Sequence, residues 1–152
     1  MATYLSFLLY FTYCICLSSI AHAFRQQSVG IRGKLICGSE PLKNTHVKLW
    51  NKNHLGTDDQ LAAGKTDSDG RYELSGGVGS LFAMNVHFKV YHDCDDLMAG
   101  GLVEEPCQRK VNFKISDDWV TRTATPDKWF DGGIMNMAFK YGDEERSCLN
   151  KK

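Results

Sequence analysis

A regular alternation of apolar and polar side chains in the middle of the sequence most constrains the fold of this chain. Between residues 84 and 92 every second residue is apolar: Met84, Val86, Phe88 and Val90. A period of two is that of a β-strand with one buried face. After residue 23, no segment shows convincing helical spacing over ten residues. The sequence therefore predicts an all-β protein.

The same alternation predicts further strands on both sides of this segment. They cover Val29–Ile36, Thr45–Trp50, Arg71–Leu74, Lys110–Ile115 and Ile134–Tyr141. Asp67–Gly70 predicts a turn, because aspartates bond their own backbone and glycine accepts a positive φ. We expect Asn51–Gln60 to be a loop, the glycines at 76, 77 and 79 to loosen the chain, and one short helix at Asp58–Ala63 or Asp117–Thr121. Seven or eight short strands, each with one buried face, predict one antiparallel β-sandwich.

The first 23 residues read as an export signal. They contain no Asp, Glu, Lys or Arg, and the 16 residues from Leu5 to Ile20 are almost continuously apolar. Ala21-His22-Ala23 is a small-x-small cleavage pattern, so Phe24 is the expected first mature residue. The apolar stretch is shorter than the roughly 20 residues that a spanning helix needs. We expect a secreted, extracellular protein with one domain at 24–152, a sandwich core at about 29–141 and a polar tail at 142–152.

Four cysteines follow the export signal, Cys37, Cys94, Cys107 and Cys148. An even number in a small exported domain predicts two disulfides, for which three pairings exist. We favour Cys94–Cys107, which closes a short loop, together with Cys37–Cys148. No Cys-x-x-Cys pair is present among the four, so a zinc site is not expected. Because export opposes a reduced thiol, His92 beside Cys94 is expected to pack or to form hydrogen bonds rather than to activate a nucleophile.

The charge balance argues against two classes of partner. All 18 basic and 18 acidic residues follow residue 23, so the formal net charge of the mature chain is zero. A general binder of nucleic acid or of anionic membranes needs a basic excess. We therefore expect no nucleic-acid partner, while a local basic patch stays open because net charge says nothing about distribution.

Five segments in order resemble the transthyretin-like family of nematodes, small secreted proteins with a transthyretin-type sandwich. The matching segments are Gly33–Gly38, Val47–Trp50, Thr66–Leu74, Tyr91–Cys94 and Cys107–Val111. Together with the residues around them they span roughly positions 29–140. The resemblance implies a transthyretin (prealbumin)-like fold. One relative looks like a bridging protein that links phosphatidylserine on dying cells to an engulfment receptor.

Five residues are candidates for contacts with a partner. Trp129 and Phe130 follow one another in a polar, glycine-rich context that predicts a loop, and large aromatics in such a loop can insert into a partner. The alternative is that one of them caps the open end of the sandwich. Trp50 lies on the polar face of its strand, as a contact residue or within a second packing surface. Arg109 and Lys110, with Arg122, form either a small basic patch or an ordinary solvated face.

No catalytic constellation is evident in the sequence, so we expect a non-enzyme without cofactor or metal. Asp67–Gly70 lacks the glutamate that an EF-hand loop carries at position twelve, and no Gly-x-Ser-x-Gly elbow is present. Our leading hypothesis is a secreted protein that presents loops and strand edges to a cell-surface protein or a membrane lipid. One alternative is a carrier of a small apolar ligand at the interface of a homo-oligomer. A more remote one is a hydroxyisourate-type hydrolase, a class that shares the transthyretin fold but ends in a Tyr-Arg-Gly-Ser-type tail, whereas this chain has Met137–Gly142.

Overall fold

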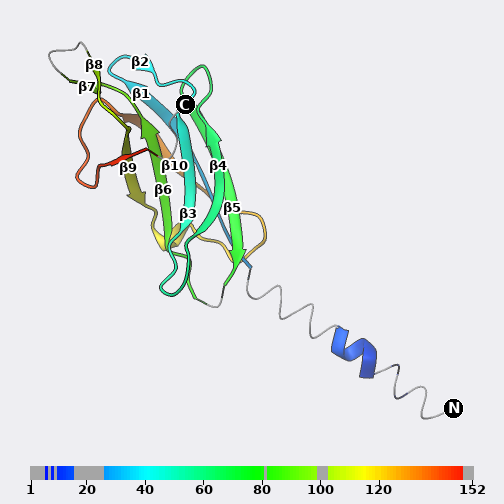
Figure 1. The fold of residues 1–152 in the computed structure, drawn as a ribbon. Coiled ribbons are helices and arrows are strands. Elements are labelled where there is room, and N and C mark those ends of the chain that lie inside the picture. Colours follow the sequence, from blue (N-terminus) through cyan, green and yellow to red (C-terminus); the bar gives the residue numbers. More distant parts are fainter. Residues whose placement is uncertain are drawn as a thin grey trace.

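The computed structural model is a sandwich of two β-sheets (Figure 1). It describes residues 6, 8, 10–15, 26–80, 82–98 and 103–148. The four-stranded sheet contains β1 (Gln26–Cys37), β2 (Glu40–Pro41), β5 (Arg71–Gly79) and β10 (Trp129–Asn136), and β1 lies between β5 and β10. The five-stranded sheet has the order β11-β9-β6-β3-β4. Its strands are β3 (His46–Asn51), β4 (Asp59–Lys65), β6 (Val86–His92), β9 (Gln108–Lys114) and β11 (Glu145–Ser147).

The predicted all-β sandwich is confirmed, with one exception to antiparallel pairing. Seven strands of the described chain have six residues or more, and the four shorter ones include a small hairpin of β7 (Leu97–Met98) and β8 (Val103–Glu104). The exception is that β10 runs parallel to β1. A single turn of 3₁₀ helix at Asp117–Trp119 falls within one of the two positions expected for a short helix.

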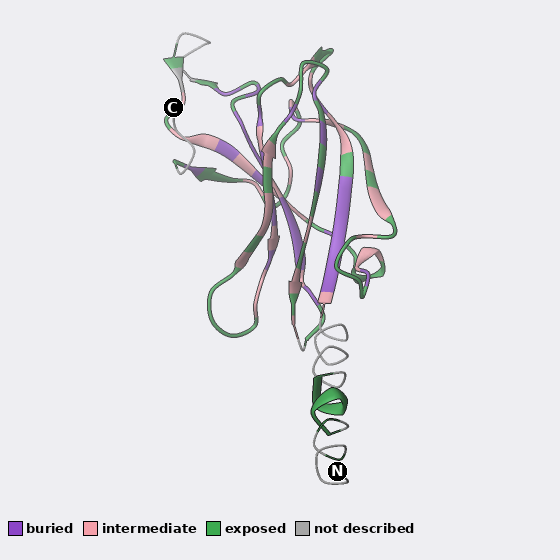
Figure 2. Ribbon diagram, turned by 90° about the vertical axis from the view of Figure 1, so that its right-hand side faces the viewer, coloured by how far each residue is buried: buried purple, intermediate pink, exposed green. Residues whose placement is uncertain are grey.

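The apolar side chains of the alternating strands meet between the two sheets. In Figure 2 the buried residues run along the strands inside the sandwich. The fully buried side chains include Val29, Ile31, Leu35, Val47, Leu49, Phe88 and Val90. Tyr72 of the four-stranded sheet stacks on Phe88 of the five-stranded sheet, with ring centroids 4.8 Å apart. This one shared core holds both layers together.

Two segments that the sequence did not predict as strands, the glycine-rich end of β5 and the whole of β4, are paired in the sheets. β5 continues through its glycines to Gly79 and pairs with the start of β1. A Cβ at Gly76 would lie 2.3 Å from the carbonyl oxygen of Leu61 in β4, so glycine allows β5 to approach the other sheet closely. β4 itself was expected to be a loop or a short helix. The expectation was wrong because its run Asp59–Lys65 is mostly exposed or half-buried and lacks a clear alternation.

The predictions for the last part of the chain also need correction. The final strand was expected at Ile134–Tyr141, but β10 ends at Asn136, and a register shift in its pairing with β1 accommodates its two glycines. The polar tail expected at 142–152 contains a strand that the sequence did not predict, β11, which pairs with β9. Arg146 adds ion pairs to Asp96 and Glu105, which connect β11 to the β7–β8 hairpin.

Both disulfides are present, but the favoured pairing was wrong. Cys37 bonds to Cys94 and Cys107 bonds to Cys148. Cys37 ends β1 and Cys94 follows β6, so the first bond joins the two sheets, and its Cα atoms are 5.7 Å apart. The second bond continues the β9–β11 pairing, in which Gln108 lies opposite Ser147. Loop length had favoured Cys94–Cys107, and a strand in the polar tail had not been expected.

The expected export signal is only partly described. Residues 6, 8 and 10–15 are helical and exposed, and the cleavage site before Phe24 lies outside the described residues. Among the described residues, no helix is both long and apolar enough to cross a membrane.

The pairing predicts a peptide map and an order of stability. Proteolysis without reduction should release one disulfide-linked peptide with Cys37 and Cys94 and another with Cys107 and Cys148. The paired cysteines are separated by 57 residues in the first disulfide and by 41 in the second. The two closed loops therefore contribute similarly to the free energy of unfolding through chain entropy, at about 4 kcal/mol each. Since Cys94 is buried and Cys148 exposed, the pair of changes C37A and C94A should lower the free energy of unfolding more than C107A and C148A, as measured by urea denaturation. A linked peptide containing Cys94 and Cys107 would contradict the structure.

Candidate functional site

The five candidate contact residues lie in three different places in the fold. Arg109 points into the interior, Trp129 and Phe130 lie in the four-stranded sheet, and Trp50 and Lys110 lie in the five-stranded sheet. Arg109 and Lys110 are consecutive residues of β9, so their side chains point to opposite faces. A shared basic patch of these two residues is therefore wrong.

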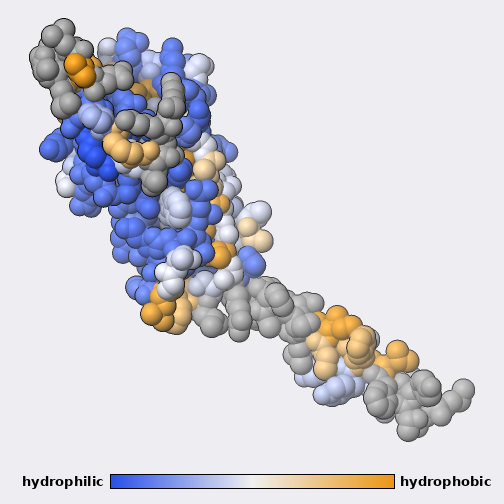
Figure 3. Space-filling model, in the orientation of Figure 1, coloured by the Kyte–Doolittle hydropathy of each residue, from blue (hydrophilic) through white to orange (hydrophobic). Residues whose placement is uncertain are grey.

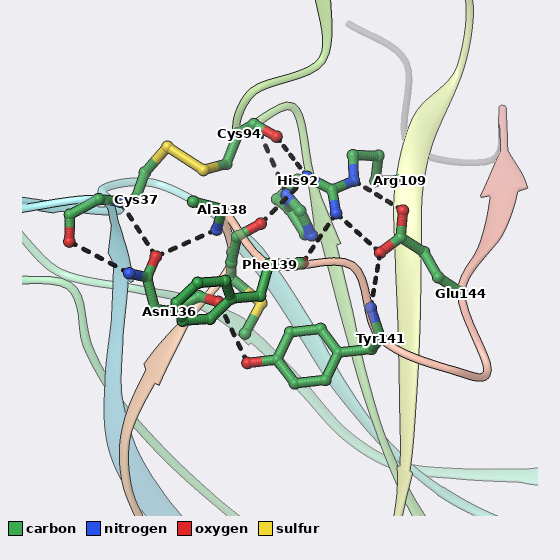
Figure 4. The surroundings of a disulfide bond; sticks show 11 residues. Cys37, His92, Cys94, Arg109, Asn136, Ala138, Phe139, Tyr141 and Glu144 are labelled. Carbon is green, nitrogen blue, oxygen red and sulfur yellow. Dashed lines mark hydrogen bonds and ion pairs between the residues drawn. A yellow bond between two sulfur atoms is a disulfide. The ribbon is translucent and has the colours of Figure 1, made fainter.

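Arg109 is a structural residue beside the Cys37–Cys94 disulfide (Figure 4). Its side chain is 7% exposed, and it forms a two-bond ion pair with Glu144 at 2.7 and 2.8 Å. The remaining N–H groups donate to the carbonyl oxygens of Cys94, Met137 and Phe139. All five guanidinium N–H groups thus have acceptors, which is the arrangement that a buried charge requires.

His92 lies next to this guanidinium and is 2% exposed. Its Nδ1 accepts a hydrogen bond from the backbone N–H of Cys94, while its buried Nε2 has no partner in the described structure. Burial, with the positive charge of Arg109, lowers the pKa of His92 to about 4. The imidazole is therefore neutral at physiological pH, and the expectation that it forms hydrogen bonds beside the disulfide is confirmed.

Trp129 and Phe130 belong to strand β10 rather than to a loop, and both are half-buried. The ring of Trp129 covers Gly30 of β1, where a Cβ would lie 2.7 Å from the indole. Phe130 packs edge-on against Trp119 at 5.6 Å between ring centroids and lies against the core. Both rings therefore have packing contacts within the sandwich, which favours the alternative of a structural role.

Trp50 and Lys110 share the outer face of the five-stranded sheet with a set of further basic residues. The strand register aligns His46, Tyr91 and Lys110 in one row, Lys48, Lys89 and Asn112 in the next, and Trp50, His87 and Lys114 in a third. Lys65 of β4 extends the first row, because it lies opposite His46. Lys52 follows β3, and its charge acts on His87 and Lys89. We call these residues the cationic face: Lys48, Lys52, Lys65, Lys89, Lys110 and Lys114 with His46, His87, Trp50 and Tyr91.

Aromatic rings support two lysines of the cationic face. The ammonium group of Lys89 lies 4.7 Å from the ring centroid of Trp50, and that of Lys48 lies 5.2 Å from that of Tyr91. In such cation–π contacts the electron-rich face of the ring attracts the charged group. Lys110 forms an ion pair with Glu145 of β11. For Lys52, Lys65, Lys89 and Lys114, the described residues include no carboxylate partner within ion-pair distance.

The positive charges of this face act on one another. Burial lowers the pKa of Lys89, and Lys110 and Lys52 lower it further, against smaller opposite effects of Asp58 and Glu145. The pKa values of His87 and His46 are also lowered, chiefly by burial and then by neighbouring lysines. The face is therefore a region of positive potential on a chain without net charge, and a bound anion would relieve this repulsion. Figure 3 shows this side of the molecule as largely hydrophilic.

The cysteines do not form a metal site. Among the described residues, Cys37, Cys94 and Asp95 bring three potential ligand atoms within 4.8 Å of one another. Both sulfur atoms belong to the disulfide, so they offer no thiolate. A cavity of about 760 Å³ next to the two disulfides is lined by basic and acidic side chains alike, including Lys43, Lys65, Asp93, Asp95 and Glu105.

Sequence reasoning missed most of the cationic face. Lys48, Lys89 and Lys114 occupy outward positions of alternating strands, so the signal was present in the sequence. The order of the strands, which brings β3, β6 and β9 side by side, could not be predicted from the alternation within each strand.

Comparison with known proteins agrees with the resemblance seen in the sequence. The sequence model of the Transthyretin-like family matches residues 32–116, which include β3, β6 and β9. Transthyretin-like protein 33 of Caenorhabditis elegans is 38% identical over 144 residues, which cover 90% of this chain and 96% of that protein. Transthyretin-like protein 5 of the same organism is 36% identical, with 90% and 95% covered. Transthyretin-like protein 46 is also 36% identical, with 91% and 75% covered.

The buried imidazole predicts how stability depends on pH. Between pH 6.5 and about 4, the unfolded chain binds a proton at His92 that the folded chain does not. The free energy of unfolding should therefore fall as the pH is lowered through this window, by up to about 1.4 kcal/mol per pH unit from this residue. The variant His92→Gln keeps an acceptor for the Cys94 N–H and should show a flatter pH dependence in urea denaturation.

The matched control is His54→Gln, which removes an exposed histidine. Because His46 and His87 contribute with the same sign, only the difference between wild type and variant reports on His92. Equal slopes for wild type and His92→Gln would show that the imidazole is not held neutral.

Proposed function

This chain belongs to the transthyretin-like family, and on that premise we propose that it is a secreted, non-enzymatic protein that binds an anionic partner outside the cell. Support for export comes from the apolar leader with its cleavage pattern and from the two disulfides, which form and persist in oxidising compartments. Support for a binding role comes from a surface whose charges exceed what the fold needs. The binding surface in this proposal is the outer side of a sheet, in place of the loops and strand edges favoured by the sequence.

The observation that carries the proposal is the cationic face. Of its six lysines, Lys52, Lys65, Lys89 and Lys114 have no carboxylate within ion-pair distance among the described residues, and the charges of Lys110 and Lys52 disfavour the charged form of Lys89. Elsewhere in the described chain, basic side chains such as Arg109 and Arg146 are matched with carboxylates. Lysines that are left without such partners on a sheet face are instead suited to receive negative charge from another molecule.

The first test concerns export. Expression of the full chain in a eukaryotic secretory host should place the protein in the medium, and N-terminal sequencing should begin at Phe24. The secreted protein should contain no free thiol, since the four cysteines that remain are paired. Retention of an uncleaved chain in the cytosol with reduced cysteines would contradict the proposal.

The second test concerns binding. The fluorescently labelled mature protein should bind to the surface of cultured cells, and the bound signal should fall as NaCl is raised from 50 to 500 mM, because salt screens contacts between exposed charges. The variant K52Q/K89Q/K114Q should bind at least about tenfold more weakly, since each lysine near an anionic surface contributes about 1 kcal/mol.

The control variant K34Q/K128Q/K140Q removes the same charge from three lysines outside the cationic face. It should bind as the wild type does. Equal loss in both variants would assign the binding to overall charge, and salt-independent binding would exclude the cationic face as its cause.

A further inference from the structure

We infer that the cationic face binds a linear sulfated polysaccharide, which lies diagonally across strands β4, β3, β6 and β9. This inference rests on the proposed function, because it names the chemical class of the anionic partner. It follows from the arrangement of the lysines, from the way in which aromatic rings hold two of them, and from the places where apolar side chains are exposed.

Four lysines form a diagonal path over the sheet, with one lysine on each of four adjacent strands. Lys65 lies in the first row of the cationic face, Lys48 and Lys89 lie opposite one another in the second, and Lys114 lies in the third. Each step along this path crosses one strand, about 4.8 Å, and moves along the strand by zero or two residues, at about 3.4 Å per residue. The path therefore carries a positive charge on every strand from one edge of the sheet to beyond its centre.

A path of this kind fits an extended anion better than a compact one. A single phosphate or carboxylate needs donors that converge on one point, as at a nest of backbone N–H groups. The lysines instead spread over roughly 14 Å across the strands and roughly 14 Å along them, so the diagonal is about 20 Å long by the usual dimensions of strands. A chain that carries a sulfate on successive sugar units offers separate charges at intervals, so each lysine can contact a different group.

Two of the four lysines are held in place before any ligand arrives. Lys48 lies over Tyr91, and Lys89 lies over Trp50. Side chains that are already ordered lose less conformational entropy on binding, which favours affinity for a flexible ligand. His46 and Asn112 lie beside this path and are half-buried. Asn112 Oδ1 is hydrogen-bonded to His87 Nδ1, so the groups of these two residues that can bond sugar hydroxyl groups are the Asn112 amide N–H groups and the His46 ring.

The exposed apolar side chains argue against a bilayer as the ligand of this face. In the described chain, the large apolar residues with the highest exposure at this end of the sheets are Leu55 and Phe82, at 88% and 70%. They lie in the loops that follow β3 and β5 rather than on the sheet. The cationic face itself presents lysines above covered rings, such as Tyr91 at 3% exposure. None of the residues aligned with the diagonal path is an exposed large apolar group of the kind that membrane-binding surfaces insert beside their basic residues. Leu55 and Phe82 lie beside Lys52 instead, which is not part of that path.

The experiment measures binding of heparin fragments of increasing length to the mature protein by isothermal titration calorimetry. The affinity should rise with fragment length until the fragment spans the diagonal. For longer fragments, the affinity per binding site should stay constant. The variant K65Q/K89Q/K114Q should reduce the affinity for the longest fragment at least about tenfold, by the weakening of charge contacts. The control variant K34Q/K128Q/K140Q should leave the affinity unchanged.

Three comparison probes separate the outcomes. Unsulfated hyaluronan and single-stranded DNA of matched length and charge should bind more weakly than heparin, and vesicles of phosphatidylserine with phosphatidylcholine should bind no better than vesicles of phosphatidylcholine alone. Binding to the anionic vesicles without binding to heparin would overturn this inference and leave the proposed function standing. DNA binding as tight as heparin binding would overturn the assignment to sulfated polysaccharide. Failure to bind heparin, vesicles and cell surfaces alike would overturn both proposals.

Discussion

The buried guanidinium of Arg109 is the contact on which the arrangement of the sandwich and its C-terminal segment depends. A charge in this position is tolerated only while every N–H group has an acceptor, because removal of one partner from a buried ion pair typically costs about 3–5 kcal/mol. The acceptors come from the end of β6, from the turn after β10 and from Glu144 just before β11. One side chain therefore ties the five-stranded sheet, the four-stranded sheet and the tail to one another, next to the disulfide that joins the same two sheets.

The anchoring of Arg109 also determines what the opposite side of β9 presents to solvent. With Arg109 held inward, Lys110, Asn112 and Lys114 must point outward. Pairing of β9 with β6, and of β6 with β3, then sets these residues in rows with Lys89 and Lys48. A slip of one residue in either pairing would turn the lysines inward, so the buried contacts that hold the register also maintain the cationic face.

The sequence predicts the side of a sheet on which a side chain lies far better than it predicts which residues lie beside it on adjacent strands. Alternation within a strand identified the core and placed Trp50 on an outward position, but it was not applied to Arg109 and Lys110, for which a shared patch was one alternative although they are consecutive in β9. Neighbours across strands depend on strand order, so the lysine rows and both disulfide partners were not accessible. Glycine was the second source of error. It was interpreted as a break in β5 and β10, whereas here it permits close approach, with Gly76 against β4 and Gly30 beneath Trp129.

A net charge of zero conceals this separation of charges, and it also limits how a partner can be recognised. At physiological ionic strength, the field of exposed charges decays over about 8 Å. The same screening means that a chain without net charge exerts little attraction from afar. A partner is then selected by the number of its charges that meet lysines at close range, which favours a long anion that lies diagonally across the strands over any single charged group.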